Sequence, residues 1–147
     1  ERALLHLAVS VFVFDGRRLL LQQRAAGKYH CGGLWANTCC SHPAWGESLI
    51  DCANRRLLEE MGFAIALSEF GTIEYAADVG GNLFEHERVT FFRGQHGGEA
   101  ILPDPAEVSD WRWIDGDALA AEMERSPASF APWFRIYMSD HFTRIFG

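Results

Sequence analysis

A thiol, an imidazole and a carboxylate-bearing helix follow one another within one short stretch of this chain. Cys40 and His42 lie in the run Asn-Thr-Cys-Cys-Ser-His-Pro at residues 37–43, and Glu59 and Glu60 follow on a predicted helix. Thiols, imidazoles and carboxylates are the side chains that transfer protons and bind divalent metals. The spacing therefore favours metal-assisted acid–base chemistry.

A second pair of carboxylates, Glu85 and Glu87, lies within a predicted strand. Alternation along the strand places both on one face, about 7 Å apart, with Val89 and Phe91 following on that face. Two glutamates leading into an apolar face are unfavourable in a core unless they bind an ion. An edge strand that faces water is the alternative, and the residues alone leave both interpretations open.

The predicted helix also carries a charged edge. Arg56 lies three residues before Glu59 and four before Glu60, so these side chains share one edge opposite an apolar stripe. Solvent-exposed ion pairs are the ordinary explanation of such a pattern. A cluster that binds a charged ligand is the alternative.

Strands that position these residues are predicted from apolar runs and turn signals. An apolar, valine-rich run predicts a strand buried on both faces, and the turn at Asp15 and Gly16 leads into a returning strand. Further strands are predicted beyond the helix, the third and fourth joined by a hairpin at residues 80–82. The predicted strands are residues 4–14, 19–24, 69–78, 84–93 and 108–114.

Three helices are predicted from capping signals and periodicity. Ser48 and Asp51 form a capping-box pattern at the start of the first, and Gly62 closes it in the left-handed region. Asp117 is predicted to cap a short second helix, and Pro132 to start the last. The apolar stripe of the first helix is predicted at Ile50, Ala53, Leu57 and Met61. Helices on both sides of strands predict an α/β sandwich around a mixed sheet.

Composition sets limits on the class of protein. The 147 residues fit a single domain, and a net charge of −7 disfavours a nucleic-acid partner. No apolar run approaches the roughly 20 residues of a membrane-spanning helix, so no membrane partner is expected. Four cysteines without a CxxC pair disfavour a disulfide scaffold or a zinc site, so we expect reduced thiols and a cytoplasmic protein. The chain begins at Glu1, which predicts that an N-terminal segment is missing.

The charged helix and the segment before it resemble the Nudix box. Glu47, Arg55, Glu59, Glu60 and Gly62 match its pattern, whose acidic helix binds divalent metal against a diphosphate. Two positions depart from the hydrolase pattern. Ser41 stands where glycine is usual, and Arg56 where the first glutamate after the arginine is usual. A cation in place of a carboxylate favours holding a diphosphate intact over hydrolysing it.

Taken together, the motifs resemble the type 1 isopentenyl diphosphate isomerases, a family built on the Nudix fold. The resemblance extends from about residue 6 to residue 138 and includes the Asn-Thr-Cys-Cys-Ser-His-Pro run, the Nudix-like helix, Glu-x-Glu and a Pro-Trp pair. It implies a single-domain Nudix-like α/β/α sandwich that converts isopentenyl diphosphate to dimethylallyl diphosphate. The implied partner is a small prenyl diphosphate, and the implied assembly is a monomer or weak dimer.

The resemblance also implies the catalytic and binding residues. Cys40 would transfer a proton on one face of the substrate, and Glu87 with Tyr75 on the other. Trp133 would stabilise the carbocation. The residues implied to hold the diphosphate are Arg24, Lys28 and Arg56. The other thiols, Cys31, Cys39 and Cys52, are assigned to the core.

Two metal sites are implied in the same way. The first would hold Mn²⁺ or Mg²⁺, with Zn²⁺ less favoured, between His6, His42, Glu85 and Glu87. The family draws a further histidine from upstream of the first strand, before this sequence begins. The second site would hold Mg²⁺, arriving with the diphosphate, at Glu60 and the backbone carbonyl of Cys40.

Two other functions would explain part of the sequence pattern. A Nudix hydrolase of a nucleoside or prenyl diphosphate would explain the helix but neither Cys40 nor His42, and Arg56 disfavours it. An inactive Nudix-like binding module would have little reason to keep a thiol, carboxylates and a tryptophan together.

Overall fold

The computed structural model describes residues 5–28, 30–80 and 83–147, with the backbone alone for residues 77–80 and 83–85. None of the helices in these ranges is long and apolar enough to cross a membrane. The elements in chain order are β1 (Leu5–Asp15), β2 (Arg18–Arg24), β3 (Trp35–Ala36), β4 (Cys39–Ser41), α1 (Leu49–Met61), β5 (Ser68–Gly80), β6 (Leu83–Gln95), β7 (Val108–Asp115), α2 (Gly116–Arg125), η1 (Pro127–Ser129) and α3 (Pro132–Phe146).

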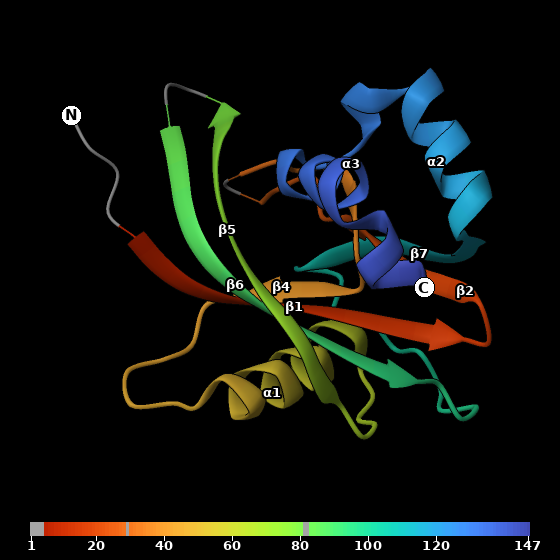
Figure 1. Cartoon of the computed structure of the whole chain (residues 1–147). Helices are drawn as coiled ribbons and strands as arrows, with labels where there is room; N and C mark the ends of the chain where they lie inside the picture. Colours follow the sequence, from red (N-terminus) through yellow and green to blue (C-terminus); the bar gives the residue numbers. More distant parts are fainter. Residues whose placement is uncertain (1–4, 29, 81–82) are drawn as a thin grey trace.

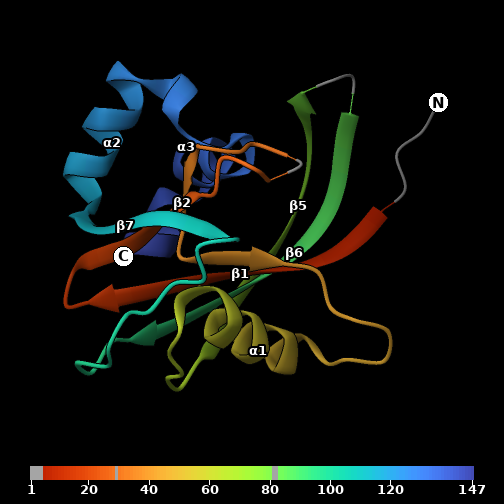
Figure 2. The same cartoon turned by 180° about the vertical axis from the view of Figure 1, so that it is seen from behind.

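Within the described part of the chain, seven strands form one mixed sheet between two helical layers. The main order is β3-β2-β1-β6-β5, with β4 paired to β1 and β7 paired to β2. β1 and β6 run parallel, and the other pairs are antiparallel. Figures 1 and 2 show α1 on one side of the sheet and α2 with α3 on the other. The predicted α/β/α sandwich is confirmed. Residues 81–82 of the predicted hairpin turn between β5 and β6 lie outside the described residues.

The central strand β1 is buried on both faces over most of its length, as its apolar run predicts. Alternate residues enter the two cores, with Ala8, Phe12 and Phe14 toward α3 and Val9, Val11 and Val13 toward α1. The start of the strand differs from the prediction, because Leu5 and Leu7 are 43% and 48% exposed. β4 pairs with β1 only from Val9 to Val11, so it leaves the edge of β1 uncovered at Leu5 and Leu7.

Both ends of α1 follow the predicted capping. The Ser48 side chain accepts a hydrogen bond from the backbone N–H of Asp51 at 3.2 Å. Gly62 ends the helix with φ +80°, and its N–H donates to the carbonyl of Leu58. A Cβ atom at Gly62 would lie 2.2 Å from the carbonyl oxygen of Leu102, so both the backbone angle and the space require glycine.

Two details of the helices correct the sequence predictions. Ile50 is exposed, and Cys52 instead contributes to the buried face of α1 together with Ala53. The cap of α2 is Asp115 and not Asp117, since the Asp115 carboxylate accepts from the backbone N–H of Ala118. The cap lies two residues earlier because β7 runs directly into the helix.

The cysteines separate as strand alternation predicts. Cys39 and Cys52 are fully buried in the core under α1, whereas Cys40, on the opposite face of β4 from Cys39, is only partly buried. Cys31 differs from the prediction. It lies in a loop with φ +57° and is only partly buried, although it packs against the core toward α3.

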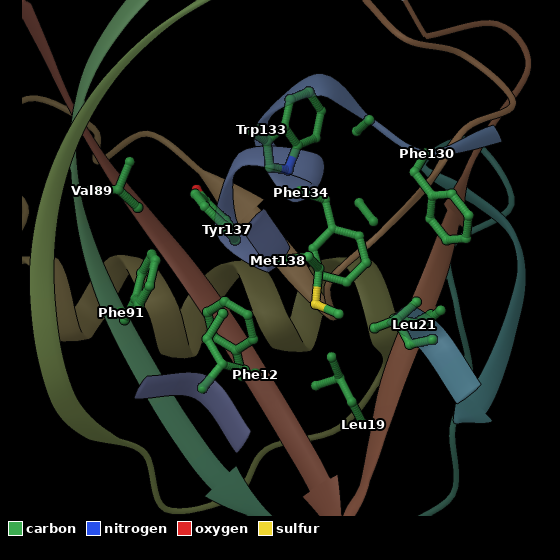
Figure 3. Close-up of a cluster of buried hydrophobic side chains, with 14 of the residues drawn as sticks. Phe12, Leu19, Leu21, Val89, Phe91, Phe130, Trp133, Phe134, Tyr137 and Met138 are labelled. Carbon is green, nitrogen blue, oxygen red and sulfur yellow. The ribbon is translucent and has the colours of Figure 1, made fainter. Parts of the chain in front are cut away.

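An aromatic core lies between α3 and the sheet (Figure 3). The rings of Phe12 and Phe91 are 5.1 Å apart, and that of Tyr137 is 4.9 Å from Phe91. Trp133 lies one turn before Tyr137 on the same helix. This core fixes α3 over the middle of β1, where the candidate site lies.

Candidate active site

A cavity of about 210 Å³ opens over the middle of β1, between the sheet and the start of α3. This volume is below the roughly 300–1,000 Å³ that is usual for ligand pockets. Most of the residues that the sequence predicted for the site line this one cavity. They are Arg24, Lys28, Cys40, His42, Arg56, Glu60, Tyr75, Glu87 and Trp133.

Small side chains on β1 form the floor of the cavity. Ala8 and Ser10 line it, and Phe12, the next residue on that face, fills the adjoining core. Strands on either side of β1 supply the reactive groups: Cys40 of β4 pairs with Ser10, and Glu87 of β6 pairs with His6. The thiol and the carboxylate therefore reach the cavity from opposite edges of β1.

The thiol of Cys40 is held by two hydrogen bonds. Its Sγ donates to Oδ1 of Asn37 at 3.2 Å and lies 3.1 Å from the hydroxyl oxygen of Ser10. Burial raises the pKa of Cys40 to about 11, although the bonds to Ser10 and Asn37 oppose the rise. The neutral thiol is therefore the form present near pH 7, and it can act as a proton donor.

The carboxylate of Glu87 is buried and paired on one side only. Its Oε1 lies 2.6 Å from Nε2 of His42, and the side chain is 4% exposed. Its Oε2 is buried without a hydrogen-bond partner among the described residues. An unsatisfied buried carboxylate oxygen is costly, so this atom is suited to a cation or a transferred proton.

The predicted metal ligands are only partly brought together. Among the side chains that the structure describes, no group of three histidines, cysteines, aspartates or glutamates lies close enough to hold a metal. The ring of His6 lies edge-on to that of His42, with centroids 6.4 Å apart. The side chain of Glu85 lies outside the described residues. The unpartnered Oε2 of Glu87 beside His42 fits a divalent cation, and the full ligand set stays a prediction.

Tyr75 and Trp133 line the cavity and form what we call its aromatic wall. Tyr75 is the β5 partner of Glu87 in the sheet register. Trp133, at 6% exposed, comes from the first turn of α3, and its Nε1 is buried without a hydrogen-bond partner among the described residues. The guanidinium of Arg24 lies 5.1 Å from the Trp133 ring and donates to the carbonyl of His30. Arg24 is thus fixed where the aromatic wall meets the basic part of the cavity.

Arg56 binds several acidic side chains on a second wall of the cavity. We call it the basic wall, and Lys28, Arg56 and Glu60 line it. Its guanidinium donates to Glu60 at 2.5 Å, to Glu59 at 2.6 Å and to the hydroxyl of Ser41 at 3.1 Å. Glu60 is 5% exposed, and its second oxygen accepts from Gln22 at 2.9 Å. The charged edge of α1 is therefore partly buried and faces the cavity, unlike a row of surface ion pairs.

Lys28 reaches the same cluster through Glu107. The ammonium of Lys28 pairs with Glu107, which also lies 3.5 Å from Arg56. The hydrogen bond from Lys28 lowers the pKa of Glu107, partly offset by burial. Lys28, Arg56 and Glu60 thus line one wall of the cavity, and Glu107, which does not line it, pairs with both cations. This arrangement can accept an anion together with a divalent metal.

Arg55, next to Arg56, has a structural contact. Its guanidinium donates to both carboxylate oxygens of Glu47, at 2.7 and 2.9 Å. Glu47 also accepts from the backbone N–H of Ala44, and these bonds, that to Arg55 foremost, lower the pKa of Glu47 to about 2. The pair fastens the 42–48 loop to α1 and so positions His42.

Comparison with known proteins agrees with this geometry. The sequence profile of the NUDIX domain matches residues 4–134. The isopentenyl-diphosphate Delta-isomerase of Cereibacter sphaeroides (strain ATCC 17025 / ATH 2.4.3) is 52% identical over 149 residues, covering 100% of this chain and 84% of the relative. The protein of that name from Dinoroseobacter shibae (strain DSM 16493 / NCIMB 14021 / DFL 12) is 48% identical, with 100% and 85% covered.

The chain belongs to the isopentenyl-diphosphate Delta-isomerase family of NUDIX-domain proteins. Solved structures of other NUDIX-type proteins share its fold. The MutT protein of Methanosarcina mazei Go1 superposes with a TM-score of 0.75 at 14% identity, covering 98% of this chain and 96% of that one. The NUDIX domain of Shewanella oneidensis NrtR, complexed with ADP ribose, gives 0.67 at 19%, covering 99% and 90%. At these identities the likeness concerns the fold alone.

Three residues of this isomerase-family site escaped the sequence analysis. Ser10 and Asn37 contact the Cys40 thiol, and the hydroxyl of Tyr137 contacts Ser10 at 2.8 Å. Burial raises the pKa of Tyr137 well above its usual value, so its hydroxyl is neutral. Ser10 was visible as a lone hydroxyl in an apolar strand, and Tyr137 as the residue one helical turn after Trp133.

Proposed function

We propose that this protein converts isopentenyl diphosphate to dimethylallyl diphosphate by transferring protons at the two sides of its carbon skeleton. The observation that carries the proposal is the placement of a neutral thiol and a buried carboxylate in one cavity, at opposite edges of β1 and beneath a tryptophan. The relatives with about half of their residues identical bear the name of this activity.

The first step is protonation of an unactivated double bond. Such an alkene offers no acidic C–H bond to a base, so an acid must add a proton to its terminal carbon and form a tertiary carbocation. Cys40 is suited to this step because its thiol is neutral near pH 7 and borders the cavity. The sulfur retains the electron pair of the broken S–H bond.

The second step removes a proton from the allylic carbon. Glu87 accepts it, with its pairing to His42 on one oxygen and a free acceptor position on the other. Tyr75, its neighbour across β5 and β6, lines the same side. The electrons of the broken C–H bond form the new double bond. Exchange with solvent then returns a proton to Cys40 and removes one from Glu87.

The aromatic wall protects the intermediate cation. The face of Trp133 can stabilise a desolvated carbocation by about 2 kcal/mol or more. Apolar and aromatic side chains around it exclude water that would otherwise add to the cation.

The basic wall would hold the diphosphate. Arg24, Lys28 and Arg56 supply the positive charge, and Glu60 with the Cys40 carbonyl would hold Mg²⁺ bound to the same group. A second divalent ion, Mn²⁺ or Mg²⁺, would be held by His42 and Glu87 together with His6 and Glu85. Such an ion would polarise the Glu87 carboxylate and keep its proton mobile.

The proposal is tested by incubating the purified protein with isopentenyl diphosphate and Mg²⁺ in D₂O and following the products by NMR. We expect dimethylallyl diphosphate with deuterium in a methyl group. Release of inorganic phosphate would instead indicate a hydrolase, and an unchanged substrate would indicate a binding module. Either of these results contradicts the proposal.

A further inference from the structure

Two hydroxyl groups, those of Ser10 and Tyr137, form a hydrogen-bonded series from the Cys40 thiol to α3. The oxygen of Ser10 lies 3.1 Å from Sγ of Cys40 and 2.8 Å from the hydroxyl of Tyr137. Ser10 and Tyr137 are each 1% exposed. Buried hydroxyls cost free energy unless they are hydrogen-bonded, and apolar side chains would fill the same space at lower cost.

The direction of these hydrogen bonds follows from Asn37. Its Nδ2 donates to the backbone carbonyls of Val11 at 3.1 Å and Cys39 at 3.2 Å, so the amide is fixed with Oδ1 toward Cys40. The thiol donates its single proton to this Oδ1. The Ser10 hydroxyl must then donate to the sulfur, and the Tyr137 hydroxyl must donate to Ser10.

The reverse direction is unfavourable. If Ser10 donated to Tyr137, the thiol proton would have to turn toward Ser10. The Oδ1 of Asn37, a fully buried residue, would lose its donor. The order Tyr137 to Ser10 to Cys40 is therefore the one that satisfies every group.

We propose that Ser10 and Tyr137 are positioning residues for proton transfer by Cys40. When the S–H bond turns from Asn37 to the substrate, the hydrogen bond from Ser10 remains on the sulfur and holds it at the cavity floor. As the proton leaves, charge develops on the sulfur, and a bond from a hydroxyl to a charged atom strengthens. Tyr137 fixes the orientation of Ser10 and prevents its hydroxyl from turning away.

Tyr137 of this hydrogen-bonded series and Trp133 of the aromatic wall lie on the same helix. Tyr137 follows Trp133 by one turn of α3, so one helix presents both the Trp133 ring and the Tyr137 hydroxyl (Figure 3). The ring of Tyr137 is locked against Phe91 at 4.9 Å. A rigid donor needs no reorganisation during the reaction, which is the condition for effective electrostatic stabilisation.

This inference rests on the proposed function, and three isosteric variants test it. Ser10→Ala and Tyr137→Phe each remove one hydroxyl, and the double variant removes both. Thr90→Val is the matched control, since Thr90 is a buried hydroxyl on β6 that contacts Thr72 and does not line the cavity. The NMR assay gives kcat and KM for isopentenyl diphosphate, and urea unfolding gives the stability of each variant.

We expect Ser10→Ala to lower kcat by about 10- to 100-fold and to change KM by less than about threefold, because the lost bond acts on the sulfur and not on the diphosphate. Tyr137→Phe should lower kcat by about 3- to 10-fold. The double variant should match Ser10→Ala, since Tyr137 acts through Ser10. Thr90→Val should keep kcat within about twofold.

Several results would overturn the inference. They are a kcat within twofold of the wild type for both single variants, effects that multiply in the double variant, or an equal loss of kcat in Thr90→Val. If Ser10→Ala does not fold, Tyr137→Phe alone decides, and an unchanged kcat refutes the proposal. A wild-type protein that forms no dimethylallyl diphosphate overturns the proposed function and this inference together, whereas an active wild type with active variants overturns the inference alone.

Discussion

Replacing Arg56 by alanine removes the cation that binds the acidic side chains at the basic wall of the cavity. Arg56 contacts Glu59, Glu60 and Glu107, and its own side chain is 18% exposed. Without it, the buried carboxyl group of Glu60 loses its cationic partner, and Gln22 remains as a hydrogen-bond donor to it. Breaking such a pair is costly because the remaining charge is neither hydrated nor paired.

The magnitude follows from the exposure of each partner. The bond to Glu60 is 2.5 Å long at a side chain only 6% exposed, so its loss costs about 2–3 kcal/mol. Glu59 is 46% exposed, and its bond to Arg56 adds at most about 0.5 kcal/mol. We expect Arg56→Ala to lower the free energy of unfolding by about 3 kcal/mol, and the melting temperature by about 6–12 °C.

Urea and thermal unfolding in the presence of EDTA measure this loss. Arg88→Ala is the matched control, because Arg88 pairs with Glu74 at 3.2 Å where both side chains are about half exposed. Its expected cost is below about 0.5 kcal/mol. Adding Glu60→Gln to Arg56→Ala should restore part of the loss, since the buried charge is then removed. Mg²⁺ should restore part of it in the single variant if Glu60 binds that ion.

The reasoning is refuted if Arg56→Ala is no less stable than Arg88→Ala. It is also refuted if the double variant is less stable than Arg56→Ala alone, because the buried charge of Glu60 would then not be the cause of the loss.

Four further predictions follow from the site. Cys40→Ala and Glu87→Gln should each lower kcat by about 10³-fold or more, whereas diphosphate binding measured by calorimetry should be kept. Trp133→Phe should lower kcat less. A Cys40→Ala variant that keeps most of its activity would contradict proton transfer from two sides. Elemental analysis should find a divalent metal after gentle purification, with less in His42→Ala, and a metal-free wild type would count against the site. Colorimetric assays should detect no phosphate or nucleoside monophosphate released from nucleoside diphosphate derivatives, and turnover above about 1 s⁻¹ would support a hydrolase. The hydrogen bond from Arg55 foremost lowers the pKa of Glu47 to about 2. The Glu47 carboxylate therefore contributes stability above its ordinary pKa of 4.5, and this contribution is lost as the pH falls toward 2. The free energy of unfolding, measured across that pH range, should fall more steeply for the wild type than for Glu47→Gln.

Local features of the fold could be predicted from the sequence because they depend on neighbouring residues. Each cap of α1 joins atoms that are at most four residues apart: Ser48 with Asp51 at the start, and Gly62 with Leu58 at the end. The separation of Cys39 from Cys40 follows from strand alternation alone. The shift of the α2 cap to Asp115 shows the limit of such reasoning, since two nearby aspartates offered the same signal.

Much of the candidate site was also accessible from the sequence, through motifs whose residue types suit one chemistry. Cys40, His42 and Glu60 come from one continuous segment, so their proximity was a short-range expectation. Strand alternation alone made Glu87 a candidate ion ligand, with an edge strand facing water as the alternative. Trp133 was accessible only through the resemblance to a family. The register that pairs Glu87 with His6, and so directs it to the same cavity, belongs to the parallel pairing of β1 and β6.

The sequence by itself determined the amphipathic patterns, the caps and the inventory of reactive side chains, since these need only local geometry. The tertiary structure alone decided which distant groups touch. Ser10 and Tyr137 are 127 residues apart, and Lys28 and Glu107 are 79 apart. Such contacts depend on strand order, register and the seating of α3 on the sheet, and many arrangements of the same elements would satisfy the local patterns equally well. Packing of the aromatic core selects one of them, and with it the surroundings of the Cys40 thiol.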